Sequence, residues 1–267
     1  MHPYLRIGDW VIEAYALFFI LGWLVGGAVF YGEVRRRGWP LDKLLFAMAG
    51  CILGAVVGAL LAGMLFFDWP EVVLHLSTLE LVGKSVVGGI AGGFAGVEIA
   101  KKLVRYPHST GDAFAIAIPL GHAVGRIGCF LGGCCYGSVS ALPWAVRYPS
   151  GSLPHLAQVA RAEIAPDQPT SLPVHPTPLY ELGFDLLLFA ALFALRDRLR
   201  IRGSLFRLYL FAYATFRFGL EFIRADSPLP AAGGPKPIQI LLAVAAARYA
   251  WVLWRQELAP PIERDIA

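Results

Sequence analysis

Seven long hydrophobic segments run along the chain, separated by connections that carry most of its charged residues. A helix needs roughly 20 apolar residues to cross the hydrocarbon core of a bilayer, and these segments approach that length. They lie near residues 11–31, 44–67, 82–100, 112–135, 178–195, 204–223 and 237–254. The pattern predicts an all-α, polytopic membrane protein with seven transmembrane helices in a single domain over residues 1–267.

Lysine and arginine residues in the connections predict the orientation of these helices. They cluster after the first, third and fifth segments, and fewer occur on the opposite side. The clusters are Arg35, Arg36, Arg37 and Lys43; Lys101, Lys102 and Arg105; and Arg196, Arg198, Arg200 and Arg202. Because connections rich in Lys and Arg stay in the cytoplasm, the amino terminus is expected outside and the carboxyl terminus in the cytoplasm.

The composition excludes several other classes of protein. Charged residues make up 16% of the chain, against about 25% in soluble domains, and the mean hydropathy is +0.60. An ordinary water-soluble enzyme, a disordered chain and a disulfide scaffold are therefore excluded. The net charge of +4 is small, and no nucleic-acid partner is expected.

One connection, at about residues 138–177, is much longer than the others and rich in proline. In the predicted orientation it lies on the outer face, in the periplasm. Long connections of this kind are uncommon and often serve as lids or binding segments, although a loosely ordered connector has the same composition. Both interpretations stay open at this point.

Glycines recur every fourth residue in the second and third segments. Gly50, Gly54 and Gly58 form one stripe, and Gly88, Gly92 and Gly96 form another. Such stripes let two helix backbones approach closely. A nucleotide-binding loop is rejected, because no strand pattern precedes these glycines.

Ionisable residues inside the segments require a reason, since each costs at least about 2.5–3.5 kcal/mol near the middle of a bilayer. His122, Arg126 and Cys129 are spaced i, i+4, i+7 and share one face of a helix. Arg217, Glu221 and Arg224 have the same spacing in the sixth segment. Arginines on two helices at similar depth would repel one another unless an anion joined them, and their planar guanidinium groups suit phosphate. The alternative is a ladder of ion pairs that only locks helices together.

Three cysteines lie close together in the sequence GRIGCFLGGCCYG, where the fourth segment reaches the outer face. Cys129 could form a disulfide with Cys134 or Cys135, because the outer compartment of a bacterium is oxidising. One thiol could instead be a nucleophile near Arg126, or all three could hold a soft metal. Their spacing matches no strong zinc or redox signature, so no metal and no cofactor are predicted.

Five sequence motifs give the chain a resemblance to a known family. They are HPYLRIGDWVIEAYAL, VGGIAGGFAG, GRIGCFLGGCCYG, HPTPLYE and RFGLEFIR, in that order. Together they resemble the bacterial prolipoprotein diacylglyceryl transferases, seven-span enzymes of the inner membrane. That family moves the diacylglyceryl group of phosphatidylglycerol to the cysteine thiol of a lipobox and releases glycerol 1-phosphate. The resemblance implies phosphatidylglycerol and lipobox-containing prolipoproteins as partners, and a multi-pass protein of the bacterial inner membrane.

The resemblance also implies which residues act. Arg126 matches the arginine of the family's GRxGNF signature, and Arg217 and Glu221 match its RFxxEF motif. Other recurrent positions fall at Tyr15, His175, Tyr180 and Glu181. We expect Arg126, Arg217 and Arg224 to surround the phosphate, with Glu221 orienting the arginines. His122 or Glu181 would take the thiol proton, because displacement of a phosphate ester by a thiolate needs both a phosphate clamp and a base.

The chain departs from the family pattern at three positions. Val87 stands where members usually have the histidine of an HGG motif, Cys129 replaces the signature asparagine, and Cys134 replaces a glutamate. Lys84, one turn before Val87, could contribute another polar group to the substrate site. We therefore expect a divergent, cysteine-bearing branch of the family. Two alternatives remain: an enzyme of the same fold that uses Cys129, Cys134 and Cys135 for thiol chemistry or another acceptor, and a non-catalytic phospholipid-binding protein.

Overall fold

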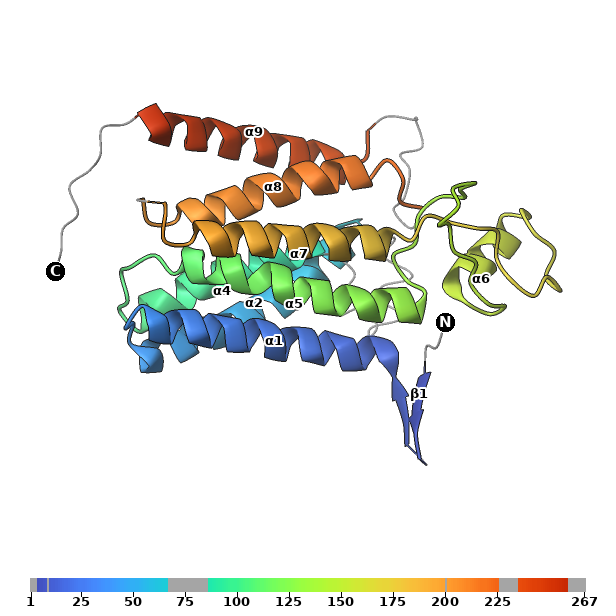
Figure 1. The fold of residues 1–267 in the computed structure, drawn as a ribbon, viewed down its shortest axis with the longest axis horizontal. Helices are drawn as coiled ribbons and strands as arrows, with labels where there is room; N and C mark the ends of the chain where they lie inside the picture. The colour runs from blue at the N-terminus through green and yellow to red at the C-terminus, as the bar shows by residue number, and fades with distance from the viewer. Residues whose placement is uncertain (1–3, 9, 67–85, 200, 226–234, 259–267) are drawn as a thin grey trace. The chain divides into compact units, whose positions relative to one another are not determined.

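The computed structural model describes residues 4–8, 10–66, 86–199, 201–225 and 235–258 and is dominated by helices (Figure 1). The long helices are α1 (Ala14–Arg36), α2 (Leu41–Phe66), α4 (Val86–Leu103), α5 (Gly111–Gly132), α7 (Thr177–Leu195), α8 (Ser204–Leu220) and α9 (Pro237–Leu258). A short helix, α6 (Leu153–Ala160), lies between α5 and α7. Each predicted hydrophobic segment thus corresponds to one long helix that overlaps it, and the prediction of a helical fold is confirmed.

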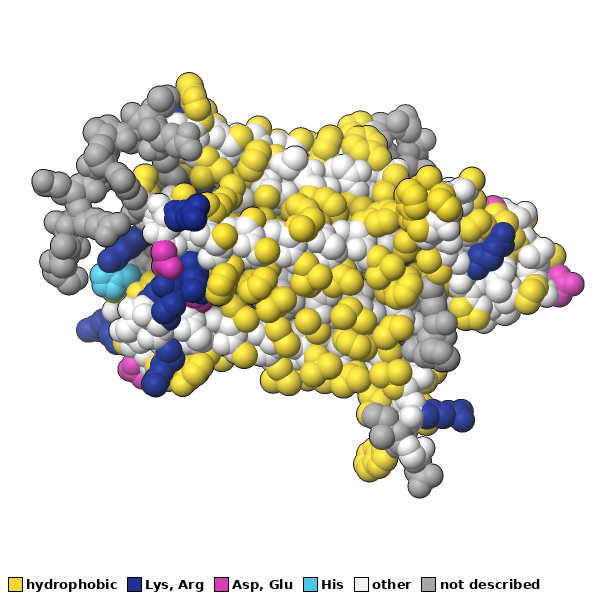
Figure 2. All heavy atoms as spheres, in the orientation of Figure 1, with side chains coloured by type: hydrophobic (Ala, Val, Ile, Leu, Met, Phe, Trp, Pro, Cys, Tyr) yellow, Lys and Arg dark blue, Asp and Glu magenta, His cyan; other side chains and the backbone are white. Residues whose placement is uncertain are grey.

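Five of these helices, α1, α2, α5, α7 and α9, are long and apolar enough to cross a membrane. Of the other two, α8 has only 17 residues, and α4 carries Glu98, Lys101 and Lys102 near its end. Large apolar side chains such as Leu53 and Leu187 point away from the protein, exposed by 68% and 74%. Figure 2 shows such hydrophobic side chains covering the helices on the face in view. Lipid covers such surfaces at no cost, so the fold is that of a polytopic helical membrane protein.

The chain forms two compact units, Tyr31–Ser109 and the remainder. In the first unit, α2 packs along α4 through the two predicted glycine stripes. A methyl group added at Gly50 would lie 2.5 Å from the carbonyl oxygen of Gly96, and one added at Gly58 would lie 2.7 Å from the Cα atom of Gly92. Real side chains never approach backbone atoms so closely, so the predicted close contact of the two helices is confirmed.

The other unit contains α5, α7, α8, α9 and the first part of α1. Here too glycines let backbones meet: a methyl group at Gly22 of α1 would lie 2.6 Å from the carbonyl oxygen of Gly121 on α5. Farther along the same pair of helices, Phe30 and Phe114 pack with ring centroids 4.3 Å apart. Helix α5 also contacts α7 and α8, so its polar stripe faces neighbouring helices rather than lipid.

Two short strands precede the first helix, where the sequence predicts helix from residue 11. Strand β1 (Tyr4–Ile7) pairs antiparallel with β2 (Trp10–Glu13), with Ile7 opposite Trp10. The prediction is wrong for residues 11–13. Hydrophobicity alone cannot separate strand from helix over so short a run, and Gly8, at a φ of +62°, permits the tight turn that makes a hairpin.

The long connection is folded rather than loosely ordered. Tyr148 is fully buried and packs with Tyr136 and Val174, and burial raises the pKa of Tyr148. Val146 and Val174 exchange two backbone hydrogen bonds of 3.0 Å. At its base, Gly137 pairs with Arg224, and Ser138 donates a 2.7 Å hydrogen bond to the carbonyl oxygen of Ile223. The connection is thus bonded to the segment that follows α8.

Candidate functional site

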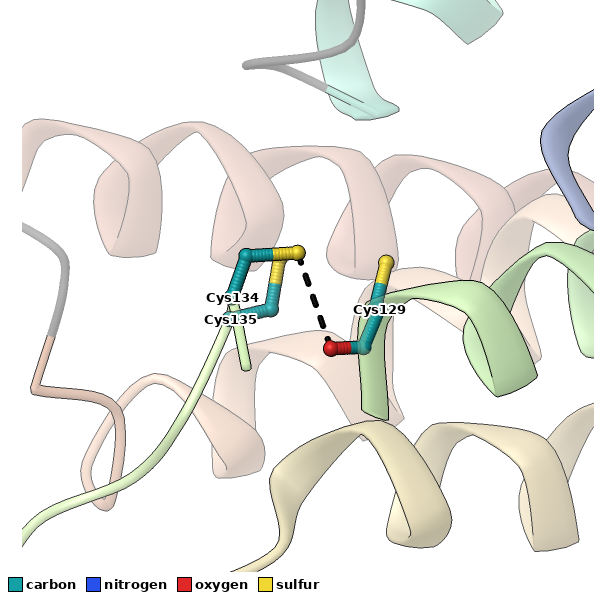
Figure 3. Close-up of side chains that lie close together, drawn as sticks. All are labelled: Cys129, Cys134 and Cys135. Carbon is teal, nitrogen blue, oxygen red and sulfur yellow. Dashed lines mark hydrogen bonds between the residues drawn. The ribbon is translucent and has the colours of Figure 1, made fainter. Parts of the chain in front are cut away.

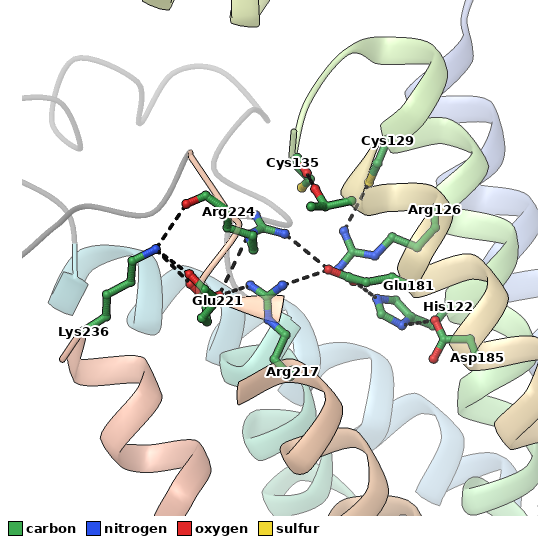
Figure 4. A network of polar contacts seen from close by, with 11 residues as sticks. His122, Arg126, Cys129, Cys135, Glu181, Asp185, Arg217, Glu221, Arg224 and Lys236 are labelled. Carbon is green, nitrogen blue, oxygen red and sulfur yellow. Dashed lines mark hydrogen bonds and ion pairs between the residues drawn. The ribbon is translucent and has the colours of Figure 1, made fainter. Parts of the chain in front are cut away.

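Arginines from separate elements converge on a single carboxylate, that of Glu181 (Figure 4). Arg217 Nη1 lies 2.8 Å and Arg224 Nη1 3.3 Å from Glu181 Oε1. Arg126 of α5 forms an ion pair with the other carboxylate oxygen. Glu181 lies in the first turns of α7 and is only 1% exposed. The anion that joins the two arginine-bearing helices is therefore part of this chain.

A second carboxylate, Glu221, extends the network from the end of α8. Its Oε1 atom lies 2.5 Å from Arg217 Nη2, one helical turn earlier, and 3.9 Å from Arg224 Nε. Lys236, just before α9, donates a 2.9 Å hydrogen bond to the carbonyl oxygen of Glu221 and lies 3.5 Å from its Oε2. Glu221 is thus paired with Arg217 of α8 and also with Lys236 at the start of α9.

His122 is held by a carboxylate of its own. Its Nδ1 atom lies 2.7 Å from Asp185 Oδ2, and its Nε2 atom lies 3.8 Å from Glu181 Oε2. Both pairs of residues, His122 with Arg126 and Glu181 with Asp185, are four positions apart on their helices, so each pair presents one face. The imidazole therefore has a fixed orientation between two buried carboxylates.

The network is not a closed ladder of ion pairs. Arg126 and Arg217 each keep a buried Nε atom without a hydrogen-bond partner among the described residues. Four cations, Arg126, Arg217, Arg224 and Lys236, pair with two carboxylates, those of Glu181 and Glu221, and a third carboxylate, that of Asp185, pairs with His122. The cluster thus has unused donors and one positive charge in excess, which is what an additional anion would need.

The three neighbouring cysteines form a cluster of their own (Figure 3), and Cys129 and Cys135 lie beside the charged network (Figure 4). Their sulfur atoms all lie within 4.8 Å of one another, and all three are free thiols. Arg126 Nη1 donates to Cys129 Sγ at 3.6 Å, and Cys134 Sγ donates to the carbonyl oxygen of Cys129 at 3.7 Å.

Among the described residues, three other predicted site residues form no hydrogen bond or ion pair with the charged network. Tyr15 packs its backbone against Gly128 and its Cβ atom against Gly132 of α5. His175 Nδ1 lies 3.2 Å from the hydroxyl of Tyr180, which also accepts a 2.7 Å hydrogen bond from Trp144. Among the described contacts, Tyr180 belongs to this aromatic group and not to the cluster of its neighbour Glu181. Lys84 lies outside the described residues.

A profile of the prolipoprotein diacylglyceryl transferase family matches residues 3–255, nearly the whole chain. The chain belongs to this family. Two relatives, both named phosphatidylglycerol–prolipoprotein diacylglyceryl transferase, illustrate the similarity. The protein of Geobacter sulfurreducens is 30% identical over 87% of this chain and 85% of its own length. That of Coxiella burnetii (strain RSA 331) is 28% identical over 84% of this chain and 81% of its own length.

Two residues of the charged network in this member of the diacylglyceryl transferase family could not be identified from the sequence. Asp185 is four residues after Glu181, a signal that fits packing as well as it fits an orienting role. Lys236 reads as a cation of an outer connection, and nothing in its neighbourhood indicates that Glu221, 15 residues earlier, is its partner. Only the fold, which brings the start of α9 against the end of α8, reveals the contact.

Proposed function

We propose that this chain moves the diacylglyceryl group of phosphatidylglycerol to the cysteine thiol of a lipobox-containing prolipoprotein and releases glycerol 1-phosphate. Membership of an enzyme family of that activity supports the reaction. The observation that carries the proposal is the convergence of Arg126, Arg217 and Arg224 on one buried carboxylate, with the Nε donors of Arg126 and Arg217 unused among the described residues.

The charge balance of the reaction explains why the arginines would matter. The phosphodiester of the lipid carries one negative charge, and the glycerol phosphate that leaves carries two. Guanidinium groups fixed beside it therefore interact more strongly with the transition state than with the ground state, which is the condition for catalysis. Glu181 and Glu221 hold these groups in place before the lipid arrives, so little reorganisation is needed.

His122 is the best placed group to receive the thiol proton. When Nδ1–H donates to Asp185, the free Nε2 atom is the acceptor. A proton taken up at Nε2 would give an imidazolium between Asp185 and Glu181, whose negative charges stabilise it. Glu181 acts here as an electrostatic partner, because its two oxygens already accept from arginines.

The proposal also assigns the topology. Seven helices would cross the bacterial inner membrane with the amino terminus outside, α4 and α8 included, since the basic residues at the ends of α1 and α4 favour the cytoplasm. The folded connection at 138–177 would then face the periplasm and serve as the binding segment for the acceptor, within one transmembrane domain over residues 1–267. Tyr15, His175 and Tyr180 would line the approach of substrate, and Lys84 would contact a second headgroup oxygen.

The test is transfer in a defined bilayer. Purified protein in phosphatidylglycerol nanodiscs is incubated with a lipobox peptide, and the diacylglyceryl thioether is measured by mass spectrometry. We expect thioether from the wild type, a loss of at least 100-fold in Arg126→Ala, and normal product from Arg202→Ala, which removes an exposed arginine. Bound lipid without turnover in the wild type would instead identify a non-catalytic phospholipid-binding protein. Product from an unrelated acceptor alone would favour the alternative enzyme.

A further inference from the structure

Among the described residues, the cysteine cluster is the one group of reactive side chains beside the site that the proposed reaction leaves without a role. Cys129 ends the polar stripe of α5, and Cys134 and Cys135 follow the turn that closes that helix. Their three sulfur atoms come within 4.8 Å of one another, and no His, Asp or Glu among the described residues joins the group. A donor set made only of thiols selects soft d¹⁰ cations, Zn²⁺ or Cu⁺, over harder ions.

The backbone holds the three thiols in this arrangement. Gly133, at a φ of +75°, ends α5, and the amide of Cys134 donates a 3.1 Å hydrogen bond to the carbonyl oxygen of Cys129. Cys135 has a φ of +58°, a left-handed conformation that residues other than glycine rarely adopt. A hydrogen bond from the Thr177 hydroxyl to the carbonyl oxygen of Cys135 helps to keep it there. Strained backbone that the surroundings maintain is a mark of functional sites.

The distances suit a metal after small side-chain rotations. A tetrahedral ion with metal–sulfur bonds of about 2.3 Å keeps its sulfur ligands about 3.8 Å apart. The sulfur atoms here, at most 4.8 Å apart, would need to move by only about 1 Å, which rotation about a Cα–Cβ bond provides. Arg126, whose Nη1 atom lies 3.6 Å from Cys129 Sγ, would offset the negative charge of three thiolates around a divalent ion.

We propose that Cys129, Cys134 and Cys135 bind one thiolate-seeking d¹⁰ cation, and that Zn²⁺ in this site keeps its fourth position for the thiol of the acceptor. Three protein ligands with one open position are typical of catalytic zinc, whereas Cu⁺ would be satisfied by the three sulfurs alone. This inference rests on the proposed transferase function, because only that function brings a second thiol to the site.

The acceptor thiol loses its proton when it binds the metal, and the proton passes to His122 and then to water. The bound thiolate sulfur forms a bond to the glyceryl carbon of the lipid as the bond from that carbon to the phosphate oxygen breaks. The electron pair of the broken bond leaves on glycerol phosphate, which becomes a dianion beside Arg126 and Arg217. No oxidant or reductant is consumed. A metal-bound thiolate would thus compensate for Val87, which stands where the family usually has histidine.

The first measurement detects the metal without reference to activity. The full-length protein is purified in detergent with Zn²⁺, or anaerobically with Cu⁺, and bound metal is counted by mass spectrometry after gel filtration. Exchange with Co²⁺ should give the sulfur-to-cobalt charge-transfer band of a thiolate site. We expect one ion per chain, a loss of at least tenfold in affinity in Cys134→Ser and Cys135→Ser, and no change in Cys51→Ser, which removes the one cysteine of the sequence outside the cluster.

The second measurement separates this inference from the proposed function. Cys135→Ser should bind lipid like the wild type but transfer at least tenfold more slowly, whereas Arg126→Ala should lose both. Wild-type protein that binds no metal, or that contains a disulfide between two of these cysteines when purified with a mild reductant, overturns the metal site even if transfer is observed. If the protein binds one metal ion per chain but transfers no diacylglyceryl group, the metal site stands and its proposed role in the reaction is overturned. If the protein binds one Cu⁺ in preference to Zn²⁺, the proposal that a zinc ion keeps its fourth coordination position open for the acceptor thiol is overturned.

Discussion

Replacement of Glu181 by glutamine tests the centre of the charged network most directly. The variant keeps the size of the side chain but leaves Arg126, Arg217 and Arg224 around a neutral amide. Glu181 is only 1% exposed, so water cannot replace the lost charge. Removal of one partner of a buried ion pair costs about 3–5 kcal/mol, since the remaining charge is left uncompensated. Three arginines depend on this one carboxylate, so we expect the upper part of that range.

The loss should appear in thermal unfolding of the detergent-solubilised protein. At about 2–4 °C per kcal/mol for a chain of this size, Glu181→Gln should lower Tm by roughly 8–20 °C. Glu163→Gln is the matched control, because Glu163 is exposed and lies 3.9 Å from its arginine partner. An exposed pair of this kind contributes about 0–1 kcal/mol, so this variant should unfold almost like the wild type.

The same variant should respond to phosphate. With the internal anion gone, the arginines would bind an external one, and an anion at 100 times its Kd stabilises the folded state by about 2.7 kcal/mol. We expect inorganic phosphate to restore much of the lost Tm in Glu181→Gln, with little effect on the wild type or on Glu163→Gln. A variant that unfolds within 1 °C of the wild type, or that phosphate leaves unchanged, would refute the view that Glu181 is the internal anion of a phosphate site.

Three further changes probe other parts of the structure. His122→Gln should fold normally but lower the rate of thioether formation by about 10²–10⁴, the usual contribution of a general base; an unchanged rate assigns the proton to another group. Lys236→Met should lower Tm through loss of the contacts with Glu221, and an unchanged Tm would show that this lysine is dispensable. Gly50→Ala should destabilise the folded protein by about 1–3 kcal/mol, because its methyl group overlaps α4. Gly32→Ala is the control and should not destabilise it, because Gly32 has open space around it. Equal effects of the two variants in thermal unfolding would contradict the close packing of α2 on α4.

Much of the fold could be predicted from the sequence because burial in lipid imposes a simple pattern. Long apolar segments located the helices, and glycines at every fourth position located the contact between α2 and α4. Both signals are local, in that they depend only on residues within one helix. The hairpin before α1 was not predicted, because four-residue strands leave no period that distinguishes them from the first turn of a helix.

The site could be predicted only in part, for the same reason. Spacing within a helix correctly placed His122 with Arg126, and Arg217 with Glu221, on common faces. Which carboxylate would meet which arginine depends on the register between helices, and the sequence does not contain it. Sequence made Glu181 one of two candidates, with His122, for taking the thiol proton, and did not indicate that it pairs with arginines of two other elements. The clustering of Cys135 with Cys129 depends on a left-handed residue, which few sequence patterns reveal.

The bridge between Gly137 and Arg224 joins the folded connection at 138–177 to the arginine cluster through main-chain atoms alone. Ala225 strengthens the junction by donating to the carbonyl oxygen of Tyr136. A partner that tilts this connection would therefore also shift the backbone of Arg224, with no side chain needed as an intermediary. Replacing the connection at 138–177 with that of another family member should therefore change both the acceptor preference proposed for this connection and the affinity for phosphate. The two properties should evolve together.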